Sequence, residues 1–457
     1  MNAIILSAIW GVLMMFSGIF LSKKSAIRNL AIAGVALVLL VNIAEMGHWQ
    51  LFQIDTRNML VFDRFGLLFN TIAFASTLLY LLLSAKDVEE VGTHQAEYFA
   101  LILFVLCGVG IASAFNTLLM LFLGIEIISI PLYILTGTDK RNLKSNEASL
   151  KYFLMGSFST GIMLMGIALI YGATGSFAVE NMSHQLEGLA PLLTAGLLLL
   201  LIAMSFKVSA APFHFWTPDV YDGAPTVFTS FMATIVKAAV FIAFIRLFDA
   251  AFGVNLADWR LTIAFIIAAT LFIGNITAVF QQSVKRMLAY SSIAQAGFML
   301  FALFGYSAIA KEGILLYAAA YSIATIGIFA VLLKVKDYTF DGFNGLGKTH
   351  PLLAATNTIF LLSLAGIPAT AGFFAKYYML LAAVKSGAYL WLVFFAVLCA
   401  AVSVYYYFRV IQAMYFKEGN PQVRETSSGF RVVLVVLAAL VILFGLFPQM
   451  ITSHLYF

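Results

Sequence analysis

Residues 190–217 read APLLTAGLLLLLIAMSFKVSAAPFHFWT, an apolar run that contains one lysine, Lys207, and a proline near its end, Pro212. A run of about 18 or more apolar residues is typical of a transmembrane helix. Proline removes a backbone hydrogen bond and clashes with the preceding turn, so we expect the helix to break at Pro212. In hydrocarbon the freed backbone groups need partners, and such breaks lie inside protein or line wet cavities. The stretch therefore predicts a membrane protein with a broken helix in its interior.

The rest of the chain follows the same pattern. Its 457 residues are 62% hydrophobic and 10% charged, whereas a soluble domain holds about 25% charged residues. The runs are continuous and do not alternate at every second residue, which favours helices over a β-barrel. We therefore predict an all-α integral membrane protein with about 14 transmembrane helices. The expected spans are 2–21, 26–44, 63–84, 96–113, 115–136, 149–171, 190–217, 224–247, 258–280, 286–304, 311–334, 351–384, 388–412 and 430–449.

Several other classes are disfavoured. The net charge is +5, but the basic residues are scattered through short loops, so no nucleic-acid partner is expected. Cys107 and Cys399 lie in apolar segments without metal or cluster spacing. The glycines of 108–113 lie inside a predicted span and lack the context of a dinucleotide fingerprint. We expect no NADH, flavin, iron–sulphur or metal site in this chain, whose surroundings are the lipid bilayer.

The basic residues predict an orientation. Seventeen lysines and arginines fall in loops after odd-numbered spans or at the adjoining span ends, and six fall in the loops after even-numbered spans. The positive-inside rule places the first set in the cytoplasm. Both termini are then expected outside.

Three lysines, Lys207, Lys237 and Lys376, and one carboxylate, Glu126, lie within predicted spans. Glu126 is about 16 Å deep at 1.5 Å per residue, and a charge at the middle of the membrane costs about 2.5–3.5 kcal/mol or more. Buried ion pairs that fix helix packing explain two of the four residues at best. An intramembrane proton relay explains them all.

Lysine suits such a relay. Burial favours the neutral form of its amine, and a nearby carboxylate favours the charged form. A moving or titrating carboxylate can therefore switch a buried lysine between holding and releasing a proton. Arginine stays protonated and cannot be switched in this way.

Four further residues allow two readings each. Lys151 begins a span beside a basic loop and is either a snorkelling interfacial lysine or a relay residue. His214, just after Pro212, either relays protons or packs with a hydrogen bond. Asp219 and Asp222 follow His214 in the sequence. They either form a proton entrance or exit, or cap a helix.

A second long span, 351–384, also contains a proline, Pro368. Paired interrupted segments point to inverted repeats, and five-helix units would bring the second copy into the membrane from the opposite side. The predicted parts are an N-terminal three-helix segment 1–95, a first five-helix repeat 96–247, a second five-helix repeat 258–412 and a C-terminal helix 413–457.

Two motifs make the chain resemble a known family. The stretch APFHFWTPDVYDGAPT at 211–226 and the stretch VKRMLAYSSIAQAG at 284–297 are similar to signatures of the N subunit of bacterial NADH–quinone oxidoreductase, an antiporter-like membrane subunit of respiratory complex I. The resemblance covers nearly the whole length. The related M type carries glutamate in the twelfth span, where this chain has Lys376, and the L type has a long C-terminal arm.

The resemblance implies roles for single residues. Glu126 matches the fifth-span glutamate, and Lys207 matches the seventh-span lysine that pairs with it. Lys237 matches the central lysine of the eighth span, Lys376 the lysine of the twelfth, and Lys151 a lysine of the sixth. We expect these residues to translocate protons, and His214 is a further candidate through the chemistry of its imidazole.

The resemblance also implies the chemistry around the chain. The enzyme would be a proton-translocating NADH–quinone oxidoreductase, a translocase, of which this chain is a subunit without a redox centre. NADH, FMN, iron–sulphur clusters and quinone would be bound by partner subunits, and neighbouring antiporter-like subunits would be contacts in the membrane. Two alternatives are a subunit of an Mrp-type cation/proton antiporter and a membrane scaffold that transports nothing.

Overall fold

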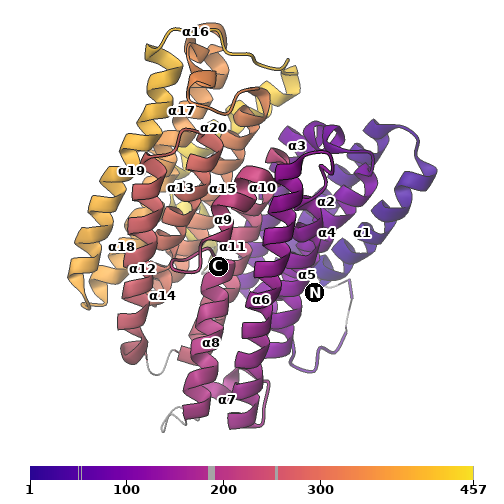
Figure 1. Cartoon of the computed structure of the whole chain (residues 1–457). Helices are drawn as coiled ribbons and strands as arrows, with labels where there is room; N and C mark the ends of the chain where they lie inside the picture. The colour runs from indigo at the N-terminus through magenta and orange to yellow at the C-terminus, as the bar shows by residue number, and fades with distance from the viewer. Residues whose placement is uncertain (50, 53, 184–190, 253–255, 456–457) are drawn as a thin grey trace.

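The computed structural model describes residues 1–49, 51–52, 54–183, 191–252 and 256–455. Every regular element in these ranges is a helix. The long helices run side by side as one bundle, and short helices cap its ends (Figure 1).

The helices follow the predicted segments. The N-terminal part contains α1 (Asn2–Phe20), α2 (Lys24–Met46) and α3 (Arg64–Val91). The next part contains α4 (Gln95–Ala114), α5 (Leu118–Thr136), α6 (Leu143–Thr174), α7 (Glu180–Ser183), α8 (Pro191–Lys207), α9 (Trp216–Gly223), α10 (Thr226–Phe231), a π-helix (Met232–Val236) and α11 (Lys237–Phe252). The last part contains α12 (Leu256–Val279), α13 (Val284–Met299), α14 (Phe301–Phe304), α15 (Ala308–Lys334), α16 (Leu346–Thr349), α17 (Pro351–Ala365), α18 (Ala371–Lys385), α19 (Leu390–Phe416), α20 (Ser428–Leu446) and α21 (Gln449–Thr452).

Twelve helices of the described part are long and apolar enough to cross a membrane. The other two predicted spans are the interrupted ones. Helix α8 ends at Lys207 and α9 begins at Trp216, while α17 ends at Ala365 and α18 begins at Ala371. The breaks predicted at Pro212 and Pro368 are therefore confirmed. Residue 190, the predicted start of the seventh span, lies outside the described residues.

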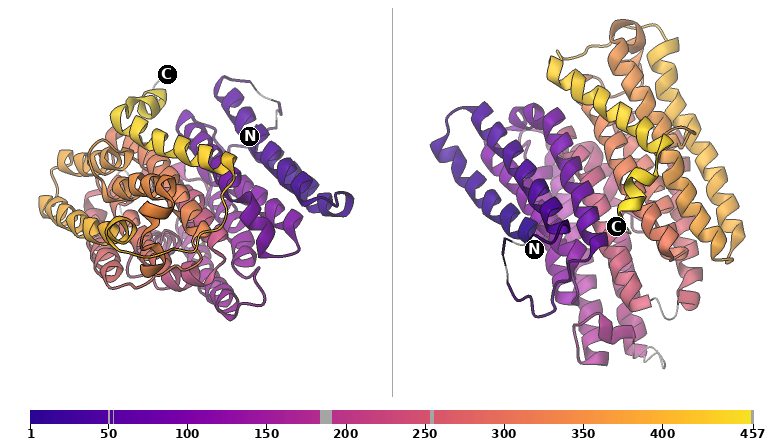
Figure 2. Two further views of the ribbon diagram at one scale, coloured as in Figure 1. Left: turned by 90° about the horizontal axis from the view of Figure 1, so that it is seen from above. Right: turned by 180° about the vertical axis from the view of Figure 1, so that it is seen from behind.

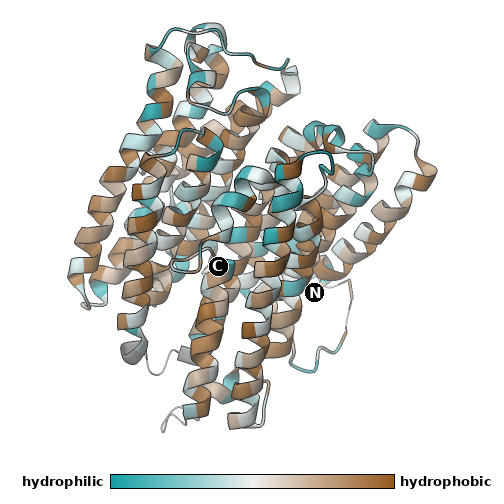
Figure 3. Cartoon of the chain, in the orientation of Figure 1, coloured by the Kyte–Doolittle hydropathy of each residue, from teal (hydrophilic) through white to brown (hydrophobic). Residues whose placement is uncertain are grey.

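Helix α15 lies at the centre of the bundle. It contacts α3, α17, α18 and α20, and its most apolar stretch is entirely buried. The C-terminal α20 packs on α3, α15, α17 and α18, so it joins the N-terminal helices to the last part of the chain (Figure 2). The outer helices keep apolar side chains on their shafts, and hydrophilic residues gather toward the helix ends and around α9 (Figure 3).

The loops separate into two sets at opposite ends of the bundle. A hollow of about 590 Å³ is lined by loops that follow odd-numbered spans, including 139–144, 222–227 and 337–339. Another, of about 550 Å³, is lined by segments that follow even-numbered spans, including Asn116, Glu180 and Asp249. We call these the α16 end and the α7 end after the short helix at each (Figure 1). The separation is the one that the predicted alternation of spans requires.

The predicted end of the third span is wrong, as is the predicted start of the sixth, since α6 begins at Leu143 and not at 149. The residues added to the third span include one partner of a buried ion pair. The sequence reading ended the third span at residue 84 and counted Lys334 among the basic residues beside the loops. In the structure α3 continues to Val91, and Asp87 and Lys334 are 5% and 9% exposed. The Lys334 Nζ donates to both Asp87 carboxylate oxygens at 2.8 Å and lies 5.1 Å from the centre of the Phe430 ring. The helix continues because the pair compensates the buried charge of each partner.

We predict that Asp87→Ala destabilises the protein by about 3–5 kcal/mol, because it leaves the Lys334 ammonium buried without a counter-charge. The double variant Asp87→Leu with Lys334→Met should recover most of the loss, since no buried charge remains. Thermal unfolding of the purified protein in mild detergent measures both. Equal melting temperatures for Asp87→Ala and the unmodified protein would contradict the structural role of the pair.

Candidate functional site

Glu126 of α5 and Lys207, the last residue of α8, form the pair that the sequence predicted. Lys207 Nζ lies 3.6 Å from Glu126 Oε1. Thr160 of α6 donates to the same carboxylate oxygen at 2.7 Å, and Lys207 donates to Ser129 Oγ at 3.0 Å. The lysine side chain is 8% exposed and the glutamate side chain 17%. The two charges are thus close but held largely through hydroxyl groups, an arrangement that can change without unfolding a helix.

Lys237 is held by neutral oxygens. Lys237 is the first residue after the π-helix Met232–Val236, a local widening of the helix that is frequent at functional sites. Lys237 is 2% exposed, and its Nζ donates to the carbonyl oxygen and the hydroxyl of Ser292, both at 2.9 Å. The ring of Tyr221 lies 5.9 Å away. The carboxylates of the described residues form no ion pair with Lys237, so this ammonium is solvated by oxygen atoms of the next five-helix unit.

Lys376 of α18 occupies the second helix break. Its Nζ donates to the carbonyl oxygens of Leu364 and Ala365 at 2.8 and 3.0 Å. These carbonyls end α17 and have no partner within that helix. Gly366 ends the helix at φ 83°, where a glycine is favoured, and a Cβ at this position would lie 3.0–3.4 Å from atoms of the Lys376 side chain. The break thus supplies both the acceptors and the room for the lysine.

Four of the predicted relay residues fall into two groups. Glu126 and Lys207 pair in the first five-helix unit, and Lys237 and Lys376 both contact α13, through Ser292 and through the ring of Phe298 at 4.8 Å. Among the contacts of the described residues, none joins Lys207 directly to Lys237.

Lys151 belongs to a cluster of ion pairs. Its Nζ lies 2.7 Å from Glu147 and 2.8 Å from Asp219, and its side chain is partly exposed. Asp219 also accepts from Arg286 at 3.0 Å, and Asp222 lies 3.9 Å from the same guanidinium. Lys151 therefore contacts the short helix α9 and not Glu126.

His214 lies in the segment between α8 and α9. Its ring is 4.6 Å from that of Phe215, and its Nδ1 is buried and finds no hydrogen-bond partner among the described residues. The ring contact fits a packing role. No described contact connects His214 to Lys207 or Lys237, so its part in a relay stays a prediction.

Lys285 is a buried lysine that the sequence did not predict, since it falls in the loop before the span expected at 286–304. In the structure Lys285 is buried near the start of α13 and donates to the carbonyl oxygens of Asp222 and Ala224 at 2.8 and 2.7 Å. These carbonyls end α9, as those of Leu364 and Ala365 end α17. The signal available in the sequence was the position of Lys285 within the motif at 284–297.

The sequence reading also missed Ser292, Thr160 and Ser129, which contact the predicted charges. Serine and threonine within apolar helices commonly bond their own backbone, as Ser129 does with Ile125. Their extra role depends on neighbours far along the chain.

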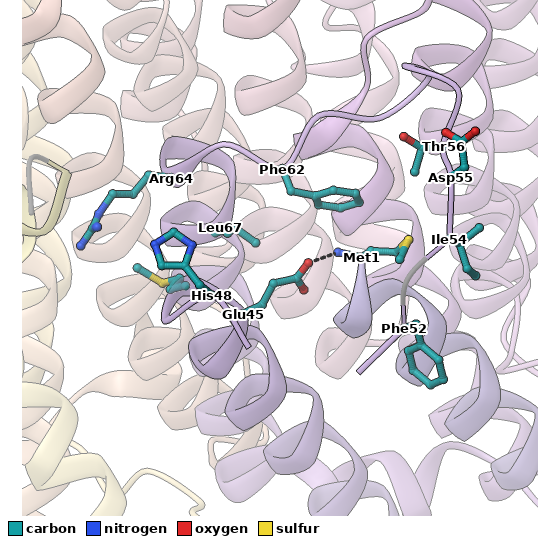
Figure 4. Close-up of a pocket in the computed structure, with 11 residues that line it drawn as sticks. Met1, Glu45, His48, Phe52, Ile54, Asp55, Thr56, Phe62, Arg64 and Leu67 are labelled. Atoms are coloured by element: carbon teal, nitrogen blue, oxygen red, sulfur yellow. Dashed lines mark hydrogen bonds and ion pairs between the residues drawn. The ribbon is translucent and has the colours of Figure 1, made fainter. Parts of the chain in front are cut away.

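A separate hollow of about 580 Å³ lies beside α1, α2 and α3. Its lining includes Glu45, which pairs with the amino group of Met1, and also His48 and Arg64 (Figure 4). None of the predicted relay residues lines it, and it stands apart from the lysines.

Comparison with known proteins gives consistent matches over the whole chain. A family model described as "NADH:quinone oxidoreductase/Mrp antiporter, TM" matches residues 115–403. An NADH-quinone oxidoreductase subunit N of Cytophaga hutchinsonii is 42% identical over 457 residues, which cover 99% of this chain and 98% of that relative. A chain of respiratory complex I from Thermus thermophilus is 31% identical with a TM-score of 0.85, covering 99% of this chain and 98% of that one. A chain of the Mrp complex from Dietzia sp. has a TM-score of 0.86 at 19% identity, covering 100% and 96%, and is alike in fold alone.

Proposed function

This chain belongs to the NADH-quinone oxidoreductase subunit N family, and from that premise we propose that it is the proton-translocating membrane subunit of such an enzyme. The observation that carries the proposal is the set of three lysines within the predicted spans, Lys207, Lys237 and Lys376, whose side chains are at most 8% exposed. Two of them, Lys237 and Lys376, are held by neutral oxygens alone among the described residues. A structural ion pair accounts for neither, whereas a group that must gain and lose a proton needs such a setting.

The chain contributes to the enzyme without redox chemistry of its own. NADH oxidation and quinone reduction, with their FMN and iron–sulphur clusters, take place in partner subunits, and the energy reaches this chain through neighbouring membrane subunits. The chain lies in the bacterial inner membrane, with the α16 end in the cytoplasm and both termini outside. The uneven distribution of basic residues between the two sets of loops supports this orientation.

Residues 96–247 and 258–412 act as two inverted five-helix repeats, between the N-terminal segment 1–95 and the C-terminal helix 413–457. In support, each unit contains one broken helix, and each break carries a lysine. Lys207 ends α8, and Lys376 lies in α18 against the end of α17.

The Glu126–Lys207 pair acts as the input switch. While the carboxylate is close, the ammonium of Lys207 has a counter-charge. When Glu126 moves away or is neutralised, Lys207 is left as an uncompensated buried cation, which is strongly unfavourable. A proton then leaves toward Lys237 and onward to Lys376. Thr160 bridges the pair, since it donates to Glu126 and accepts from Lys207 at 3.5 Å, and Ser129 accepts a further hydrogen bond from Lys207. These hydroxyls allow the pair to separate by small movements.

A subunit of a cation/proton antiporter is the second candidate, because the fold also matches a chain of an Mrp complex. The two candidates differ in the proteins that accompany the chain. We predict that purification in mild detergent yields a large complex with flavin and iron–sulphur absorbance. A complex of membrane subunits without any redox centre would instead support the antiporter.

We predict that Lys237→Ala assembles but loses proton pumping by about tenfold or more, since it removes the central titrating group. Lys237→Arg should lose as much, because arginine does not release its proton. The measurement is NADH-driven proton uptake by inverted membrane vesicles at matched amounts of assembled complex. Full pumping by the arginine variant would show that residue 237 need not titrate.

We predict that Glu126→Gln also assembles but pumps poorly, because it fixes the neutralised state of the switch. Lys207→Ala should show a similar defect, and the double variant should be no worse than either single one, since both changes disable one element. The same vesicle assay compares the three. If Glu126→Gln pumps at the unmodified rate while Lys207→Ala does not, the two residues are not a functional pair.

A further inference from the structure

Polar side chains line the contact between α13 and α15, in the region that separates Lys237 from Lys376. On α13, Ser292 and Gln295 are three residues apart and so lie on one face. On α15, Tyr317, Tyr321 and Thr325 follow at intervals of four residues and also share a face. We call these five residues the polar seam. All five are buried.

The two ends of the polar seam touch the two lysines. At one end, Ser292 accepts both hydrogen bonds of Lys237. At the other, Gln295 Nε2 donates at 2.9 Å to the carbonyl oxygen of Leu364, which also accepts from Lys376. The hydroxyl of Tyr317 donates to the amide oxygen of Gln295. The seam is therefore a set of hydrogen-bonding groups that begins at one buried lysine and ends at the other.

Tyr321 and Thr325 are the two members of the seam whose hydroxyls find no hydrogen-bond partner among the described residues, and Tyr321 is the one that also reaches the cavity beside Lys376. The phenol oxygen is buried and finds no hydrogen-bond partner among the described residues. The Tyr321 side chain lies between the ends of the seam. Ser292 and Thr325 are among its polar neighbours, and the side chain lines a small cavity of about 10 Å³ together with Gln295 and Lys376. A buried hydroxyl without a partner destabilises a fold, and phenylalanine would fill the same space without that penalty. The hydroxyl therefore has polar neighbours on α13 and α15 but no hydrogen bond that fixes its direction.

We propose that the Tyr321 hydroxyl carries the proton from Lys237 to Lys376. A hydroxyl can accept a proton on oxygen while it gives up its own, so the phenol need not ionise. In the balanced step one N–H bond of the Lys237 ammonium breaks, one N–H bond forms on the neutral amine of Lys376, and the hydroxyl ends with one proton, as it began. For the next proton the hydroxyl must turn back from the Lys376 side to the Ser292 side, a rotation about one C–O bond that no hydrogen bond among the described residues opposes.

Gln295 is a positioning residue in this step. Its amide binds Tyr317, Tyr407 and the Leu364 carbonyl at once, so it holds α13, α15, α17 and α19 in register around the cavity. An amide does not titrate at any ordinary pH. The role of Gln295 is to keep the side chains of Tyr321 and Lys376 beside the same cavity. The inference rests on the proposed function, because it requires that both lysines exchange protons.

The test uses the whole complex in inverted membrane vesicles and the rate of NADH-driven proton uptake per assembled complex. Tyr321→Phe removes only the hydroxyl and should lower the rate about tenfold. Tyr80→Phe is the matched control, since Tyr80 is equally buried but its hydroxyl donates to the carbonyl of Val227 in another part of the bundle. Its rate should not change. Tyr321→His, which restores a group able to pass protons, should recover the rate to within about threefold.

The outcomes separate this inference from the function itself. A normal rate for Tyr321→Phe beside a loss for Lys237→Ala would overturn the relay through Tyr321 and leave the function standing. A normal rate for Lys237→Ala would overturn the function. Equal losses for Tyr321→Phe and Tyr321→His would assign Tyr321 to packing and also overturn the relay. If Tyr321→Phe does not assemble, Tyr321→His decides alone: assembly with pumping supports the relay, and any other result contradicts it.

Discussion

The structure depends on lysine ammonium groups that are solvated by backbone carbonyls at the ends of broken helices. A helix that stops inside the bundle leaves carbonyl oxygens without partners, and a low-dielectric interior makes that costly. A buried lysine has the opposite need, since its three N–H groups require acceptors. Lys376 meets the end of α17 and Lys285 meets the end of α9 in this way. Each of these helix ends and its lysine therefore stabilise one another.

Ion pairs in the same bundle serve two different purposes. Lys334 and Asp87 contact directly, through both carboxylate oxygens at 2.8 Å, and join α15 to α3. Lys207 and Glu126 are 3.6 Å apart, and the hydroxyls of Thr160 and Ser129 share their hydrogen bonds. The Asp87–Lys334 pair holds α3 and α15 together, because separating it would leave two charges uncompensated in an apolar interior. The Glu126–Lys207 pair can loosen in small steps, because each charge retains a hydroxyl partner when the other withdraws.

Helix α13 contacts both interrupted spans. Its first turn holds the end of α9 through Lys285, its middle holds Lys237 through Ser292, and Gln295 binds the end of α17. Arg286 adds an ion pair to Asp219 of α9. A shift of α9 would therefore act on α13, which also contacts Lys237 and Lys376. Helix α15, on which α13 packs, is held in place by its contacts with α3, α17, α18 and α20.

The sequence by itself determined the membrane class, the two breaks and the four charges within spans, because each rests on a cost that is local in the chain. Apolar length, a proline inside a helix and a charge in hydrocarbon can all be recognised without knowing any neighbour. Only the tertiary structure decided which oxygens hold each lysine. Ser292 lies 55 residues from Lys237 and Asp87 lies 247 residues from Lys334, and no local pattern marks such partners. The same reason explains the errors at Asp87, Lys285 and Lys334: a charged residue marks the end of a span unless a distant partner compensates it, and that partner is brought into place by folding alone.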